Sequence, residues 1–227
     1  MKRGERYQQL MKIARQLISQ KGGDALTMTL LSELAGVAKP VVYTHFKNSS
    51  EVIIELLNLH YEQLTASVYS KVARASSLDD YLSSLVDASF EFENESELPI
   101  RKITNGFSGD AEINEVYLRQ EEKFVKHWQQ LLILCGCKSG AVDLAAYAIS
   151  TMISNTVYKY SLLPNQKVAR DTTKRLLAAM VASVAPDAKT KFDPRKLDLP
   201  QHRAGKEIRD SSRNDSSREK DARPTRS

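Results

Sequence analysis

The chain has 227 residues, a net charge of +5, a hydrophobic content of 41% and a negative mean hydropathy of −0.41. No run of about 18 apolar residues occurs, so a membrane-spanning helix is not expected. The N-terminal residues MKRGERYQQL contain no apolar secretory core. We therefore expect a cytoplasmic protein.

The charge is unevenly distributed along the chain. Basic residues outnumber acidic ones in residues 1–50 and 186–227, whereas acidic residues outnumber basic ones in residues 51–185. The two basic ends favour contact with nucleic acid, and the acidic middle argues against one continuous nucleic-acid surface.

The first 50 residues show the spacing and end signals of short helices. Apolar residues at helical spacing predict a first helix that ends at Gly22–Gly23. Thr27 is the expected N-cap of a second helix that ends before Gly36, and a third begins near Lys39. Proline suits the first turn of that third helix, because a first-turn N–H has no partner within the helix.

The remaining chain also predicts helices rather than strands. Asn48 is the expected cap of a helix to about residue 74, with Glu51 reaching back in a capping box. Further helices are expected from the SLDD sequence at 77–80, around 100–107, and over about 111–135, 141–163 and 167–185. The last two are apolar around most of their circumference, which predicts burial on several sides, in part by a partner subunit. After Pro186 charge dominates, and we expect a disordered tail.

Two short helices separated by a glycine turn, over residues 27–46, form a helix-turn-helix pattern. The second helix of this motif lies in the DNA major groove and reads bases from its N-terminal residues. The sequence therefore predicts a DNA-binding head.

At this point the chain resembles the TetR family of transcriptional repressors over about residues 8–57. The sequence AGVAKPVVYTHF at 35–46 is a specific local match. Further matching positions are Ala14, Leu17, Gly22 or Gly23, Thr27 and Leu31. The resemblance implies an all-α fold with a helix-turn-helix DNA-binding domain over residues 1–55 and a helical effector-binding and dimerisation domain over 56–186. The polar, basic tail expected from composition covers 187–227.

The resemblance and the chemistry of the side chains together assign roles in the head. Lys39 can meet a phosphate or a guanine edge, while Val41 and the Thr44 methyl can touch a thymine methyl. Leu31, Leu34, Val37 and Phe46 are expected to hold the motif together. A core role for Tyr43 and a merely solvated role for Lys39 or His45 stay open. The DNA-binding candidates are Thr27, Thr29, Lys39, Pro40, Val41, Tyr43, Thr44, His45 and Lys47, the last in place of a lysine that relatives carry where this chain has Ser49.

For the body, the resemblance implies a bacterial, cytoplasmic homodimer that pairs through helices 141–163 and 167–185. It also implies release from an inverted-repeat operator when a small, lipophilic effector binds, and association with the nucleoid while bound to DNA. His127, beside Trp128, is expected at the surface, with a pocket acid or base as the alternative. The candidate effector-binding residues, any of which can instead be ordinary core, are Phe90, Phe107, Phe124, Trp128, Tyr147, Met152, Asn155 and Tyr158.

Several alternatives remain at this level. A DNA-organising protein that needs no ligand can use the same head. An all-α enzyme is not expected, because no catalytic triad, phosphate-binding glycine loop or H-E-x-x-H spacing is present; no cofactor is expected either.

Cys135 and Cys137 predict two structural thiols, with a thiol sensor as the alternative. The acidic residues 91–97 predict a solvated helix end rather than a metal site. The tail either adds non-specific DNA affinity or has no such role.

Overall fold

The computed structural model describes residues 2–107 and 109–197, which contain helices and no strand. The elements are α1 (Arg3–Lys21), η1 (Gly23–Ala25), α2 (Met28–Ala35), α3 (Lys39–Tyr43), α4 (Ser49–Val72), α5 (Leu78–Glu95), α6 (Ile100–Thr104), α7 (Ala111–Leu134), α8 (Ser139–Tyr160), α9 (Gln166–Val184), α10 (Ala188–Lys191) and η2 (Pro194–Lys196). The expected all-α fold is confirmed. In these residues no helix is both long and apolar enough to cross a membrane.

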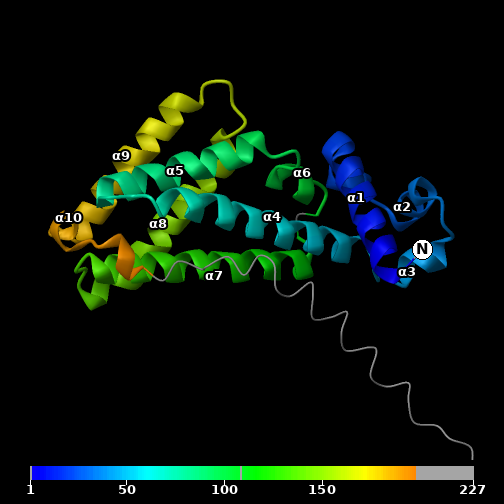
Figure 1. Cartoon of the computed structure of the whole chain (residues 1–227), viewed down its shortest axis with the longest axis horizontal. Coiled ribbons are helices and arrows are strands. Elements are labelled where there is room, and N and C mark those ends of the chain that lie inside the picture. Colours follow the sequence, from blue (N-terminus) through cyan, green and yellow to red (C-terminus); the bar gives the residue numbers. More distant parts are fainter. Residues whose placement is uncertain (1, 108, 198–227) are drawn as a thin grey trace, which may run out of the picture.

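Helices α1, α2 and α3 form a head at one end of the molecule (Figure 1). The head closes over buried apolar side chains that include Leu10, Leu31, Val42 and Phe46. The first part of α4 completes this core through Val52 and other residues. The next part of α4 continues into the body, so one helix of 24 residues crosses the expected domain boundary at residue 55.

The body packs α4, α5, α7, α8 and α9 around a second apolar core (Figure 1). Trp128 on α7, Ile149 on α8 and Leu177 on α9 are buried in it. Ser77 begins α5 as expected, since its Oγ accepts a hydrogen bond from the Asp80 N–H at 3.2 Å. At α4, Asn48 Oδ1 accepts from the Glu51 N–H at 2.8 Å, but the Glu51 carboxylate accepts from the Lys47 N–H, one residue outside the expected capping box.

Helix α6 and the turn that follows it connect the body to the head. Lys102 Nζ donates to the Ser19 carbonyl oxygen at 2.7 Å, and Asn105 Nδ2 donates to Asp24 Oδ1 at 2.8 Å. Gly23 lies so close to this segment that an added Cβ would be 2.3 Å from the Ile103 carbonyl oxygen. A side chain at position 23 would therefore push the head away from α6.

The segment after Pro186 was expected to be a disordered tail, and this expectation is wrong for its first residues. Helix α10 and η2 follow α9, and Ala188 and Leu197 are buried against the body core. Phe192 lies edge-on to Tyr81, with ring centroids 5.4 Å apart. The apolar residues after Pro186 are few among many charged ones, so composition alone does not indicate that they pack. Residues 198–227 of the expected tail lie outside the described residues.

Candidate functional sites: an exposed short helix and an apolar cavity

The second and third helices of the head are joined by a turn with the expected end signals. Thr27 Oγ1 accepts a hydrogen bond from the Leu30 N–H at 3.1 Å, which caps α2. Gly36 ends α2 with a φ of 63°, in the left-handed region that favours glycine. Helix α3 then begins at Lys39 with Pro40 in its first turn and no side-chain cap from Ala38. These interactions fix where α3 starts.

Helix α3 buries one face in the head and presents the other to solvent. Val42 and Phe46 are buried, and the Tyr43 side chain is 53% exposed. Each of the nine DNA-binding candidates is exposed or half-buried, so all of them lie at the surface of the head. The exposure of Tyr43 argues against the alternative that it is a core aromatic. Leu34, expected to hold the motif together, is 53% exposed, because its position on α2 faces away from the core.

Two of the candidates are tied to their neighbours. The Thr44 hydroxyl donates to the Val41 carbonyl oxygen at 2.7 Å. His45 is half-buried, with its ring centroid 6.4 Å from that of Tyr7 and 6.5 Å from that of Phe46. His45 is therefore partly a packing residue.

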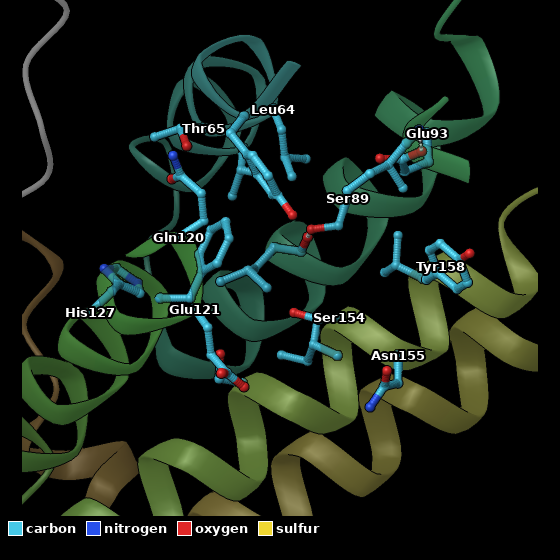
Figure 2. Close-up of a pocket in the computed structure, with 18 of the residues that line it drawn as sticks. Leu64, Thr65, Ser89, Glu93, Gln120, Glu121, His127, Ser154, Asn155 and Tyr158 are labelled. Carbon is cyan, nitrogen blue, oxygen red and sulfur yellow. Dashed lines mark hydrogen bonds between the residues drawn. The ribbon is translucent and has the colours of Figure 1, made fainter. Parts of the chain in front are cut away.

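In the body, a cavity of about 330 Å³ lies among α4, α5, α6, α7 and α8 (Figure 2). Its volume falls in the range of small-molecule sites, and such sites are mostly apolar with a few polar groups. The residues that line it are Tyr61, Leu64, Thr65, Val68, Tyr69, Leu85, Ser89, Glu93, Ile100, Tyr117, Leu118, Gln120, Glu121, Phe124, His127, Trp128, Ser150, Ile153, Ser154, Asn155, Val157 and Tyr158.

Four of the eight candidate effector-binding residues line this cavity: Phe124, Trp128, Asn155 and Tyr158. The other four do not. Phe90 lies in the body core under the Arg170 guanidinium, and Met152 packs against that same core. Phe107 packs against the core of the head. Tyr147 is on the exposed face of α8.

The cavity also contains polar residues that were not expected there. Glu93 is buried, and its Oε1 lies 2.6 Å from His60 Nε2 while its Oε2 accepts from the Ile100 N–H at 3.3 Å. The expectation of a solvated helix end over residues 91–97 is therefore wrong at Glu93. An i, i+4, i+8 pattern on α4, formed by Tyr61, Thr65 and Tyr69, was the available sequence signal for this wall.

His127 was expected at the surface, and the structure shows it buried in the cavity wall. Its Nε2 lies 2.9 Å from the Tyr81 hydroxyl oxygen. Burial lowers the pKa of His127 to about 4, so the imidazole is neutral at pH 7. His127 is next to Trp128 on α7, and both residues line the cavity.

Cys135 does not show the environment of a reactive thiol. Cys135 is buried and Cys137 is partly buried, and the two are not joined in a disulfide. Burial raises the pKa of the Cys135 thiol to about 11, which suppresses its thiolate. Across residues 2–107 and 109–197 no three His, Cys, Asp or Glu side chains are grouped as metal ligands.

Within residues 2–107 and 109–197, helices α8 and α9 each leave an apolar face exposed. Leu144 and Tyr147 on α8 are 76% and 52% exposed, and Val168 on α9 is 63% exposed. Between Asp143 and Lys159, α8 contains no charged residue. Exposed apolar area of this extent is typical of a surface that contacts another protein.

Comparison with known proteins agrees with the helix-turn-helix geometry. Residues 10–56 match the family model of bacterial regulatory proteins, tetR family. Together with the fold and the exposed α3, this match shows that the N-terminal head resembles the DNA-binding domain of TetR-family transcriptional regulators.

Individual relatives are more distant. The chain is 31% identical over 90 residues to the HTH-type transcriptional activator FasR of Mycolicibacterium smegmatis; the match covers 40% of this chain and 41% of FasR. A putative transcriptional regulator of Pseudomonas aeruginosa PAO1 has the same fold, with a TM-score of 0.65, 17% identity, and coverage of 85% of this chain and 96% of that one. The SmeT–triclosan complex has a TM-score of 0.59 at 14% identity, covering 79% and 91%.

Proposed function

We propose that this chain is a TetR-family regulator and acts as a homodimeric repressor, released from an inverted-repeat operator when a small lipophilic molecule occupies the body cavity. The observation that carries the proposal is the pairing of an exposed α3 in the head with an apolar cavity in the body that α6 connects to the head. SmeT, which has a similar fold, was solved with the lipophilic molecule triclosan.

The exposed faces of α8 and α9 support the homodimer. A second copy that covers these faces removes Leu144 and Val168 from water, along with Leu176. Burial of apolar area at about 25 cal/mol per Å² favours such an association. In the dimer the two α3 helices can then reach successive major grooves, one turn of about 34 Å apart.

Contacts through α6 support a route from the cavity to the head. The Glu93 carboxylate in the cavity wall holds the N-terminus of α6 through the Ile100 N–H. At the other end of this segment, Lys102 and Asn105 hold the head through Ser19 and Asp24. A ligand that displaces Glu93 would shift α6 and with it the angle of the head. Linkage then requires that DNA weaken ligand binding by the same factor.

The test is selection of random DNA duplexes by the purified protein, followed by titration of the enriched sequence. An inverted repeat is expected. Lys39→Ala should weaken binding to it by about 1–3 kcal/mol, and Tyr43→Phe should weaken it as well. The matched control is Lys123→Ala, which removes one exposed charge from α7 in the body.

Binding without sequence preference, which simply fades as salt rises, would overturn the operator proposal and favour a DNA-organising protein. Equal binding by the Lys39→Ala and Lys123→Ala variants would show that α3 does not enter the groove. A reporter gene placed downstream of the enriched operator distinguishes repression from activation. Repression is expected, and activation, the role that the name of FasR states for that protein, would contradict the proposal.

A further inference from the structure

The wall of the body cavity is rich in aromatic rings and has no basic side chain. Six of its residues are aromatic: Tyr61, Tyr69, Tyr117, Phe124, Trp128 and Tyr158. Two carboxylates, Glu93 and Glu121, belong to the wall, and no Lys or Arg does. The one histidine in the wall, His127, is neutral at pH 7 because burial lowers its pKa to about 4.

The two carboxylates approach the cavity from different helices. Glu93 comes from α5 and Glu121 from α7, and Figure 2 shows them well apart on the cavity wall. Glu93 is already engaged by His60 and the Ile100 N–H. Glu121 is half-buried and, among the residues that the structure describes, has no hydrogen-bond or ion-pair partner. Glu121 is thus the carboxylate that can face a charged ligand.

The carboxylates of the wall also raise the pKa values of two neighbouring tyrosines. Burial is the largest cause of the raised pKa of Tyr61, and the charges of Glu93 and Glu121 raise it further. Burial also raises the pKa of Tyr117, with Glu93 acting in the same direction. An anionic head group placed among these residues would meet the same repulsion, whereas a cation would be attracted.

Aromatic faces add a second attraction for a cation. Each ring carries a negative quadrupole at its face, and cages of such rings bind quaternary ammonium groups. Within the described residues, one ring of the wall already holds a cation: the Arg101 guanidinium lies 5.7 Å from the Tyr158 ring centroid. Arg101 itself does not line the cavity.

We infer that the cavity takes a lipophilic monocation, whose apolar tail packs on the leucine, isoleucine and valine side chains and whose cationic head lies among the aromatic rings beside Glu121. This inference rests on the proposed function, in which the cavity holds the effector. It narrows that function to one class of ligand, of which alkyl quaternary ammonium compounds are the simplest members.

The test uses three probes with the same ten-carbon tail and different heads: decyltrimethylammonium, decanol and decanoate, each below its micellar concentration. Trp128 is the only tryptophan of the chain and lies in the cavity wall, so its fluorescence reports binding directly. We expect the ammonium compound to bind about tenfold more tightly than decanol, and decanoate to bind most weakly.

Two variants separate the charge from the rings. Glu121→Gln should weaken ammonium binding about tenfold and leave decanol binding unchanged. Glu122→Gln is the matched control, because Glu122 has the same charge but is exposed and paired with Lys126 outside the cavity. Phe124→Leu keeps an apolar side chain and removes a ring, so it should weaken ammonium binding more than decanol binding. Retained decanol binding, unchanged for Glu121→Gln and weakened only slightly for Phe124→Leu, shows in each case that the variant is folded.

Tighter binding of decanoate than of the ammonium compound would overturn the inference, as would equal effects of Glu121→Gln and Glu122→Gln. No fluorescence response to millimolar decyltrimethylammonium would overturn it too. These measurements contain no DNA, so they are independent of the operator test. Release from the operator by decanoate alone would support the proposed function and contradict this inference. Binding of the ammonium compound without release from DNA would support this inference and contradict the proposed function.

Discussion

The buried His127 gives the strongest prediction for stability, because its protonation must differ between the folded and the unfolded chain. In the unfolded chain its pKa is the ordinary 6.5, and in the folded protein burial lowers it to about 4. Since the folded pKa is the lower one, the unfolded chain binds a proton first as the pH falls. Stability is therefore fully present above pH 6.5 and is lost as the pH falls toward 4.

The size of the effect follows from the same two pKa values. The whole window from 6.5 to about 4 corresponds to about 3 kcal/mol, and between pH 7 and pH 5 about 2 kcal/mol should be lost. The lowered pKa values of Glu91 and Asp110, whose largest causes are the hydrogen bonds from Lys71 and Ser50, act only at lower pH. Urea unfolding at pH 7, 6 and 5 therefore covers the range in which His127 changes protonation, and a variant at this position measures its share.

The variant His127→Gln removes the titrating group and keeps a side chain that can hydrogen-bond to the Tyr81 hydroxyl. It should flatten the stability profile between pH 7 and pH 5. The control His45→Gln removes a histidine from the head and leaves the buried imidazole in place, so it should keep the wild-type slope. A His127→Gln variant with the full loss of about 2 kcal/mol would refute the reasoning.

Three other substitutions test packing, capping and the thiols. Gly23→Ala should lower the free energy of unfolding by about 1–3 kcal/mol and weaken the coupling between ligand and DNA binding, because the added Cβ would meet the Ile103 backbone. At Gly36 an added Cβ meets nothing within 4 Å, so Gly36→Ala should strain the left-handed turn and leave that coupling intact. Asn48→Ala should cost about 0.5–2 kcal/mol in thermal unfolding through loss of its cap to Glu51. Replacing Cys135 and Cys137 together by serine should leave operator release unchanged in the presence of oxidant, and loss of regulation would restore the thiol-sensor alternative.

The head was predictable because its signals are local. Thr27, Gly36 and Pro40 each act within a few residues of their own position, as a cap, a left-handed turn and a first-turn residue. A reader of the sequence can therefore place α2 and α3 without knowing what they pack against. Leu34 was missed because its environment depends on the direction in which α2 meets α1 and α4.

The cavity was only half predictable because its wall depends on how five helices are rotated against one another. Phe90 and Glu93 are both on α5 and less than one turn apart, yet Phe90 faces the core and Glu93 the cavity. Sequence periodicity gives the apolar face of α5 but not which part of it meets a gap between neighbours. His127 shows the same limit, since its partner Tyr81 is 46 residues away in the chain.

Three polar groups of the cavity wall have hydrogen-bond partners within the chain. Glu93 is held by His60 and Ile100, His127 by Tyr81, and the Ser89 hydroxyl donates to the Leu85 carbonyl oxygen at 2.8 Å. A ligand is therefore not needed to satisfy these groups when the body folds. The binding energy of a ligand in this cavity, gained from aromatic faces, apolar surface and Glu121, remains available to shift the position of α6 and the head.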